Sequence, residues 1–254
     1  MHVLIVQAHP EPGSFNGQLT TVACAALEAA GQRVTISDLY AQNFDPLEAG
    51  RQYHHRLDPS RFVPLAEQRH ASQRGALPPD VLAEIEKLEA ADLLLLQFPL
   101  WWHGPPAMLK GWFDRVFVSG RIYRSRKRYD SGHFRGKRAL LSVTTGAPAA
   151  AFGPGARGGD MEVMLWPLHY SLHYLGFSVL AAHCHFEASG HGYSYGSQQE
   201  TQRRLREDIA AWRRRVVRLS EERPLSFPGW DDWDEAGRPK GVQAQQQGSP
   251  CASA

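Results

Sequence analysis

Residues 91–117 read ADLLLLQFPLWWHGPPAMLKGWFDRVF, where a buried-strand pattern, a tight turn and a helix pattern follow one another without a spacer. The apolar run at the start is typical of a strand that is covered on both faces of a parallel sheet. Pro105 and Pro106 fix the backbone φ angle and lack N–H donors, so we predict that a helix begins there. The turn at 99–104 carries two tryptophans and a histidine, which suit the covering of a flat aromatic ligand.

Strand and helix patterns alternate along the rest of the chain. The strand patterns cover residues 3–8, 33–37, 93–98, 139–144 and 178–182, and the helix patterns lie at about 15–30, 79–90, 105–117, 160–175 and 197–219. This alternation predicts an α/β protein with a flavodoxin-like, doubly wound, parallel five-stranded sheet and helices on both faces. Ligands of such sheets bind at the carboxyl ends of the strands.

Length and composition allow one large domain. The chain has 254 residues, of which 43% are hydrophobic and 21% are charged, with a formal net charge of +2. That charge is too small for the dense basic face of a nucleic-acid-binding protein. No apolar run reaches the roughly 18 to 20 residues that span a bilayer, and the first residues lack a signal-peptide pattern, so we expect a cytoplasmic protein without membrane association.

Two segments differ from the regular alternation. Residues 41–78 lack clear periodicity, which predicts a long excursion of functional importance. The composition then changes after Trp233 to a segment rich in Gly, Gln, Ser and Ala with little to bury. We therefore predict a catalytic domain over 1–230 and a disordered tail over 231–254.

Polar turns follow two further strand patterns. Ser14 is placed to cap a helix whose N-terminus would face an anion, although a plain capped turn is the alternative. This first turn contains neither GxGxxG nor GxxxxGK[ST], so a Rossmann dinucleotide site and a P-loop are not supported there. Thr144, Thr145 and Gly146 offer hydroxyls and close backbone approach to a planar ring. Three such turns at the carboxyl ends of strands predict one ligand crevice.

Six motifs extend this pattern to most of the chain. They are SFN, SDLYAQNFDP, LEAADLLLLQFPLWW, LKGWFDRVF, YDSGHFRGKRALLSVTTG and GDMEVMLWPLHYSLHYLGF, in this order. Over about residues 1–230 the chain thereby resembles the NAD(P)H:quinone oxidoreductase (DT-diaphorase-like) family. The resemblance implies a homodimeric FAD enzyme in which NADPH or NADH and then a quinone-like acceptor occupy one pocket, in a ping-pong mechanism of two-electron hydride transfer.

The same resemblance assigns site residues. The positions that match flavin-binding positions are His9, Ser14, Phe15, Asn16, Gln18, Pro99, Leu100, Trp101, Trp102, His103, Asp114, Thr144, Thr145, Gly146, Ala147 and Phe152. Tyr123, Arg124 and Phe177 are expected on the substrate side, with Tyr123 and Phe177 coming from the second subunit. The expected catalytic set is His103, Trp102, Arg157, Phe152 and Tyr123.

The chain departs from its relatives at two proton-handling positions. Where they carry a tyrosine and a histidine, this sequence has Phe152 and Gly158. General acid–base assistance contributes about 10²- to 10⁴-fold in rate, so a substitute is expected. Arg157 could stabilise an anionic flavin but could not donate a proton near neutral pH. His103 could do both, and we hypothesise that it does, the alternative being a polar ring that only lines the pocket.

Two other features leave alternatives open. Residues 121–129 carry five basic side chains, which suits either a solvated loop or a rim that attracts the phosphates of NAD(P)H. His169 and His173 lie four apart on a predicted helix and could meet one metal ion. The family resemblance includes a relative whose structural zinc site uses a similar histidine pair and a later cysteine, and Ser226 stands at the equivalent late position here. We therefore predict no metal at this pair, and we interpret Cys184 as a core residue.

Two other functions fit the same fold. One is an FMN-type reductase of azo or nitro compounds. The other is a flavin-binding regulatory subunit of a potassium-efflux-like system, in which Phe152 and Gly158 would reflect relaxed catalytic demand. Turnover of NAD(P)H with a simple quinone separates them.

Overall fold

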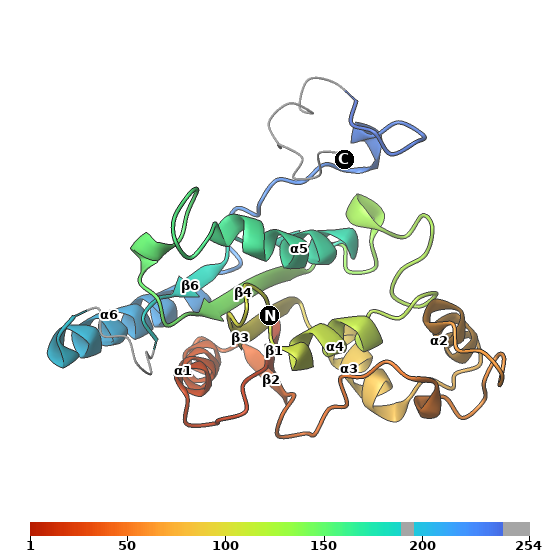
Figure 1. Cartoon of the computed structure of the whole chain (residues 1–254), viewed down its shortest axis with the longest axis horizontal. Helices are drawn as coiled ribbons and strands as arrows, with labels where there is room; N and C mark the ends of the chain where they lie inside the picture. Colours follow the sequence, from red (N-terminus) through yellow and green to blue (C-terminus); the bar gives the residue numbers. More distant parts are fainter. Residues whose placement is uncertain (189–195, 241–254) are drawn as a thin grey trace.

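The computed structural model describes residues 1–188 and 196–240 and is organised around a parallel sheet (Figure 1). The sheet has the order β2-β1-β3-β4-β5, with β6 also pairing with β4. The strands are β1 (His2–Gln7), β2 (Arg33–Asp38), β3 (Leu93–Pro99), β4 (Arg138–Thr144), β5 (Ser178–Val179) and β6 (His183–His185). This order confirms the flavodoxin-like, doubly wound α/β fold predicted from the alternation of patterns.

The fifth position of the sheet is divided between two short strands. β5 pairs with Arg138 and Ala139 at the start of β4, whereas β6 pairs with Ser142 to Thr144 at its end. The sequence had suggested one strand over 178–182. The division places the three residues of β6 beside the carboxyl end of β4, where ligands of this fold bind.

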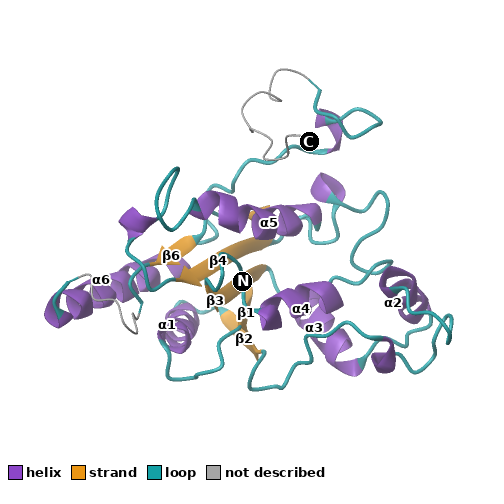
Figure 2. Cartoon of the chain, viewed as in Figure 1, coloured by secondary structure: helices purple, strands orange, loops and turns teal. Residues whose placement is uncertain are grey.

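In the part of the chain that the structure describes, six α-helices surround the sheet (Figure 2). They are α1 (Phe15–Ala29), α2 (Pro64–Gln73), α3 (Pro79–Ala90), α4 (Ala107–Val116), α5 (Met161–Tyr174) and α6 (Gln198–Val216). The expected excursion over 41–78 thus includes α2. Its buried residues are Glu67, Gln68 and Ala71, so polar side chains face the interior and no amphipathic pattern marks the helix.

The two faces of the sheet carry separate cores, and residues of β1 contribute to both because strand side chains alternate. Val3 and Ile5 pack with α1 and α6. Leu4 and Val6 pack with α3, α4 and α5. Figure 1 shows α1 and α6 on one side of the strands and α3 and α4 on the other. Burial on both faces explains the continuous apolar character of β1 and β3.

The segment after α6 returns past the sheet and extends beyond α5 (Figure 1). It forms a short 3-10 helix, η4 (Trp230–Asp232), and a bridge between Trp233 and Pro239. The Trp233 ring lies 4.7 Å from the ring of Tyr129. Residues 231–240 thus include a short helical turn and a bridge, and the expected disorder of the tail from residue 231 stays a prediction. Residues 241–254 lie outside the described residues.

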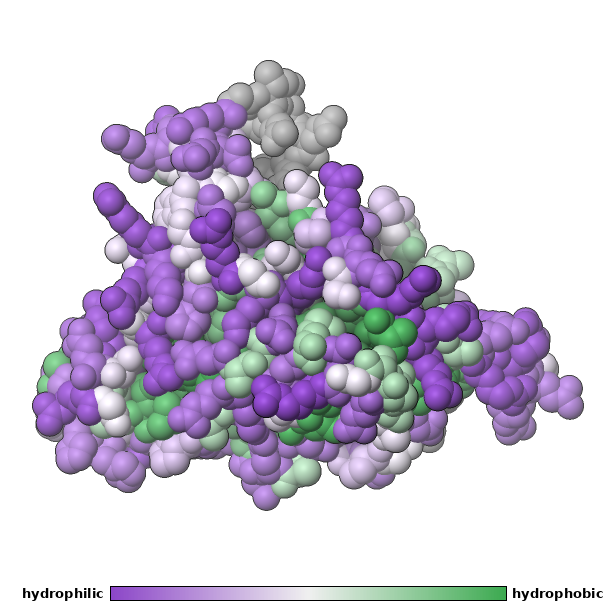
Figure 3. Space-filling model, turned by 180° about the vertical axis from the view of Figure 1, so that it is seen from behind, coloured by the Kyte–Doolittle hydropathy of each residue, from purple (hydrophilic) through white to green (hydrophobic). Residues whose placement is uncertain are grey.

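Among the residues that the structure describes, no helix has the length and apolar character needed to cross a membrane. The face shown in Figure 3 is mainly hydrophilic, and its hydrophobic surface lies in small separate patches.

Candidate functional site

The first turn (residues 8–14) connects β1 to the N-terminus of α1. Ser14 caps the helix, since its side chain accepts a hydrogen bond of 3.2 Å from the Gly17 N–H. A Cβ atom at Gly17 would lie 1.9 Å from the carbonyl oxygen of Pro12, so a glycine is needed for the turn to fold over the helix. The free N–H groups of this helix end and its dipole favour an anionic group such as a phosphate.

The structure brings the three predicted turns together at one edge of the sheet. Asn16 is buried, and its amide donates to Thr144 Oγ1 at 2.8 Å while its oxygen accepts from Gln97 Nε2 at 2.9 Å. The ring of His9 lies 5.9 Å from that of Trp101. One buried side chain thus ties together the ends of β3 and β4 and the start of α1.

The aromatic turn (residues 99–104) is strained and exposed. Trp101 and Gly104 bond to each other through both backbone groups, at 2.9 and 3.1 Å. The two residues between them, Trp102 and His103, have φ angles of 51° and 62°, in a region that costs a non-glycine residue about 1 to 3 kcal/mol. The Trp102 side chain is nevertheless 97% exposed. Strain combined with apolar exposure is typical of a surface that covers a ligand or meets another chain.

A cavity of about 650 Å³ adjoins the first turn. It lies between that turn and α6, and its lining includes His9, Ser14, Phe15, Gln18 and Arg206. Its volume is in the range of small-molecule and cofactor sites. With a helix N-terminus and an arginine beside it, the cavity fits the phosphate-bearing part of a flavin nucleotide.

The loop that carries the two departures folds compactly. The Phe152 ring lies 5.8 Å from the Phe186 ring. A Cβ atom at Gly158 would lie 2.8 Å from the Ala151 carbonyl oxygen and 3.0 Å from Phe152 Cε1. A histidine at 158 would therefore force the loop open, so this loop conformation requires a glycine at 158. Arg157 is exposed in the same loop.

The substrate-side residues Tyr123 and Arg124 line a second cavity, of about 630 Å³, together with Arg69, Arg128 and Tyr174. The rings of Tyr123 and Tyr174 are 5.7 Å apart. Burial raises the pKa of Tyr123 above its usual value, so its phenol keeps its proton at neutral pH. The cluster of arginines gives this cavity a positive charge.

Phe177 does not line this cavity, and its expected contribution to the pocket wall from a second subunit stays a prediction. The side chain is buried in the core, where it stacks on Phe134 at 4.5 Å with an angle of 20° between the rings. Tyr174, which was not predicted, lies beside Tyr123 instead. Helix α5 ends at Tyr174, and the chain turns at Gly176, which has a φ of 99°. Because of this turn, Tyr174 lines the cavity whereas Phe177, three residues later, lies in the core. Sequence matching alone gave no signal of this turn.

Asp114 is separated from the first turn within the chain, and its expected place near the adenine end of the cofactor stays a prediction. It lies in the last turn of α4, which runs away from the edge that carries the three turns. Its carboxylate is half exposed and forms an ion pair of 2.6 Å with Lys110. The position of Asp114 follows from the direction of α4, which begins at that edge and ends away from it.

Within the described residues, the histidine pair on α5 belongs to no group of three potential metal ligands. His173 Nε2 lies 3.0 Å from the carbonyl oxygen of Pro228, and His169 Nε2 is buried without a hydrogen-bond partner in the described part of the chain. Burial lowers the pKa of His169 to about 4. Cys184 packs against the core, and burial raises the pKa of its thiol to about 11. The prediction that this pair binds no metal stays a prediction.

Comparison with known proteins agrees with the fold and the edge site. A family model described as a flavodoxin-like fold matches residues 1–216, so the chain is a flavodoxin-like α/β protein. Human ribosyldihydronicotinamide dehydrogenase (quinone) is 40% identical over 225 residues, which cover 88% of this chain and 94% of the relative. NAD(P)H dehydrogenase (quinone) 1 of Cavia porcellus is 39% identical over 226 residues, which cover 88% and 79%.

A solved structure from Klebsiella pneumoniae, provisionally described as a quinone reductase, has a TM-score of 0.88 and 31% identity and covers 98% of this chain and 97% of its own. The chain therefore belongs to the NAD(P)H dehydrogenase (quinone) family. The resemblance drawn from the six motifs is confirmed.

Proposed function

We propose that the protein is an NAD(P)H-dependent flavoprotein that reduces quinones or similar flat electrophiles by two-electron, ping-pong hydride transfer. The observation that carries this proposal is the convergence of the three turns at one sheet edge, tied by the hydrogen bonds of Asn16 to Gln97 and Thr144. The relatives named as quinone dehydrogenases support it. The two free cysteines of the described chain, Cys24 and Cys184, support a reducing, cytoplasmic location.

Different residues of the chain would bind different parts of the flavin. The N-terminus of α1 would hold a phosphate, the aromatic turn would support a planar ring, and the backbone from Thr144 to Ala147 would bond the heteroatoms of that ring. We assign FAD rather than FMN because the cavity beside α6 extends from the Ser14 turn and gives room for a larger nucleotide. When bound, the flavin supplies the hydride and electron chemistry. The protein would position the hydride donor about 3 to 3.5 Å from the acceptor, the separation that hydride transfer requires.

His103 is proposed as the group that holds or moves a proton beside the ring. It is exposed at the aromatic turn, and Phe152 and Gly158 offer no titratable group. A His103→Phe variant should slow at least one half-reaction by tenfold or more in stopped-flow measurements of flavin reduction and reoxidation. An Arg157→Met variant is the matched control for the loss of a nearby cation. Unchanged rates in both half-reactions of the His103 variant would remove His103 from the mechanism.

A homodimer with shared sites is the assembly that we propose. Apolar side chains remain exposed on the aromatic turn and on α5, with Val163 at 67% and Trp166 at 45%. A cavity of about 670 Å³ with a mainly apolar lining lies between α5 and the C-terminal segment. A second subunit would cover these surfaces and bring its Tyr123 to the site. Light scattering should give twice the chain mass, and a fully active monomer would contradict this assembly.

The central experiment identifies the released flavin and measures turnover. FAD should be released on denaturation, and a simple benzoquinone should be reduced with NADPH or NADH. Comparing kcat/KM for the two donors at low and high salt tests whether the basic segment 121–129 attracts phosphate. Bound flavin without turnover would favour a regulatory subunit. Bound FMN with faster turnover of an azo dye than of the quinone would favour the other reductase class.

A further inference from the structure

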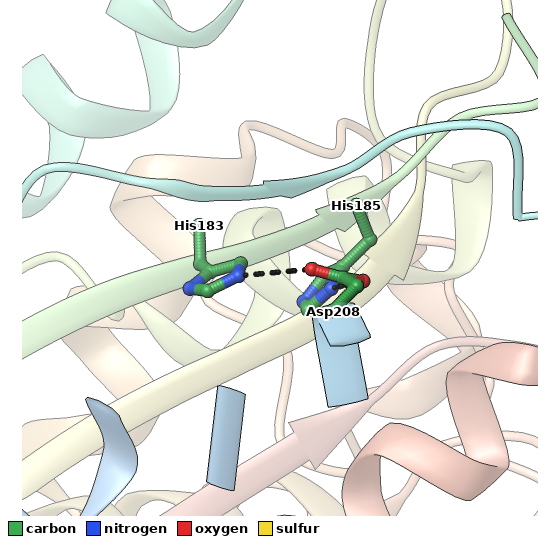
Figure 4. A group of neighbouring side chains, drawn as sticks. All are labelled: His183, His185 and Asp208. Atoms are coloured by element: carbon green, nitrogen blue, oxygen red, sulfur yellow. Dashed lines mark hydrogen bonds and ion pairs between the residues drawn. The ribbon is translucent and has the colours of Figure 1, made fainter. Parts of the chain in front are cut away.

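Three potential metal ligands meet where β6 faces α6, away from the aromatic turn and the α5 pair. His183 and His185 are two apart on a strand and therefore point to the same side of the sheet. Asp208 reaches them from α6 (Figure 4). His183 Nε2 lies 3.4 Å from Asp208 Oδ1, and His185 Nδ1 lies 2.6 Å from Oδ2. One carboxylate thus faces both imidazoles with separate oxygens.

The spacing is close to that of a metal site. Zinc binds histidine nitrogen and carboxylate oxygen at roughly 2.0 to 2.2 Å, which puts tetrahedral ligand atoms about 3.3 Å apart. The three ligand atoms here all lie within 4.8 Å of one another. Small rotations of the side chains, which come from two elements only, bring them to bonding distance. Within residues 1–188 and 196–240, this is the one group of three such ligands.

The surroundings orient the rings as an outer shell of a metal site does. His185 Nε2 lies 3.0 Å from the hydroxyl of Ser142, which is fully buried in β4, so the other nitrogen of that ring faces Asp208. Trp212 lies edge-on to both imidazoles, at 5.0 and 5.4 Å. These contacts come from β4 and α6 and restrict the ring rotations that would separate the ligands.

Access and charge are compatible with a cation. The His185 side chain is fully buried, but His183 and Asp208 are 15% and 24% exposed, so solvent can supply a fourth ligand. Arg215 is the nearby positive charge, and it is paired with Glu222 through two contacts of 2.9 Å. Cys184, between the two histidines, packs toward the opposite core and contributes no sulfur. The donor set of two imidazoles and one carboxylate suits a borderline divalent metal such as Zn²⁺.

We propose that His183, His185 and Asp208 form a binding site for one divalent transition-metal ion, such as Zn²⁺, that pins α6 to the sheet. The site is independent of hydride transfer, because none of the three residues belongs to the aromatic turn or the Thr-Thr-Gly turn. The Phe15 ring lies 6.1 Å from the His185 ring, so the ion would stiffen the region behind the first turn. Metal binding would then stabilise the fold without entering the reaction.

The test is a calorimetric titration of the full-length protein with Zn²⁺ after treatment with a chelator. The wild type should bind one ion per chain. Asp208→Asn and His183→Gln should each weaken binding at least tenfold. His169→Gln is the matched control, since it removes a histidine from the α5 pair and should change the affinity less than twofold. Failure of the wild type to bind one equivalent, or loss of binding in the control alone, would overturn the proposal.

Thermal melting keeps the test independent of a folding defect. Zn²⁺ should raise the Tm of the wild type and of His169→Gln, and it should leave the Tm of Asp208→Asn unchanged. Circular dichroism of Asp208→Asn checks that this variant is folded. An equal increase in Asp208→Asn would mean that Zn²⁺ binds elsewhere. Because neither readout uses quinone reduction, failure of the proposed enzymatic activity would not affect the result.

Discussion

The first turn and the aromatic turn lie at the same edge of the sheet. The first is fully packed and hydrogen-bonded within one chain, whereas the second leaves apolar surface exposed. The first turn is closed by the Ser14 cap and by the close approach of Gly17 to Pro12, with Asn16 bonded on both sides. The aromatic turn has two residues at positive φ and an almost fully exposed Trp102. The first is preorganised for an anion, whereas the second has apolar surface that a ring or another subunit must cover.

The largest effect is expected from a substitution in the first turn. Gly17→Ala places a methyl group 1.9 Å from the Pro12 oxygen, so the turn must move. We expect a loss of about 2 to 3 kcal/mol in unfolding free energy, together with release of flavin. Gly104→Ala is the control in the aromatic turn, because a Cβ there meets nothing within 4 Å. Urea denaturation and flavin content should separate the two variants, and equal behaviour would contradict the contrast between the turns.

A second prediction concerns α5, where Trp166 exposes apolar surface as Trp102 does in the aromatic turn. The folded chain holds the pKa of His169 at about 4, below the ordinary value of 6.5. The unfolded chain therefore takes up the proton first, so the neutral ring favours folding above pH 6.5 and this stability is lost as the pH falls toward 4. Between pH 7 and 5 the loss should be about 1 to 2 kcal/mol.

Urea denaturation from pH 8 to 5 checks this. In His169→Leu that part of the pH dependence should disappear, while Ser171→Ala, a change on an exposed hydroxyl of the same helix, should keep it. A variant that loses stability with falling pH as steeply as the wild type would show that His169 is not the group responsible.

A third prediction relaxes the strain of the aromatic turn. Glycine tolerates the φ of 62° found at His103, so His103→Gly should raise the unfolding free energy of the chain by about 1 kcal/mol. The same variant should reduce quinone turnover, since it also removes the proposed proton-handling group. Thermal melting and kcat/KM measure the two effects. A variant that is less stable than the wild type would mean that the His103 side chain has contacts that outweigh the backbone strain.

The smallest effect is expected outside both turns. Asp114→Asn removes an ion pair whose two side chains are 50% and 59% exposed, so the stability should change by less than about 0.5 kcal/mol. Flavin content should stay within twofold of the wild type, because Asp114 lies at the far end of α4 from the three turns. A large loss of flavin would indicate that Asp114 contacts the cofactor bound with a second subunit.

Much of this organisation could be predicted because it depends on local patterns. The strand order required only the alternation of helices and strands, and Ser14, Thr144 and the aromatic turn were found because polar residues follow apolar runs. Helix α2 was missed because its buried side chains are Glu67 and Gln68, which give no apolar periodicity. The structure of residues 231–240 was not predicted because it depends on a contact far along the chain, between the rings of Trp233 and Tyr129.

The sequence by itself determined the fold class, the family and the turns at the carboxyl edge, since each follows from residues that are close in the chain. Only the tertiary structure decided that Tyr174 rather than Phe177 accompanies Tyr123, that Trp102 and His103 are strained, and that Asp208 meets the two histidines of β6. The physical reason is that these relations depend on helix direction, turn geometry and packing between distant elements. A local pattern specifies what an element buries, but contacts between elements are set when the whole core packs.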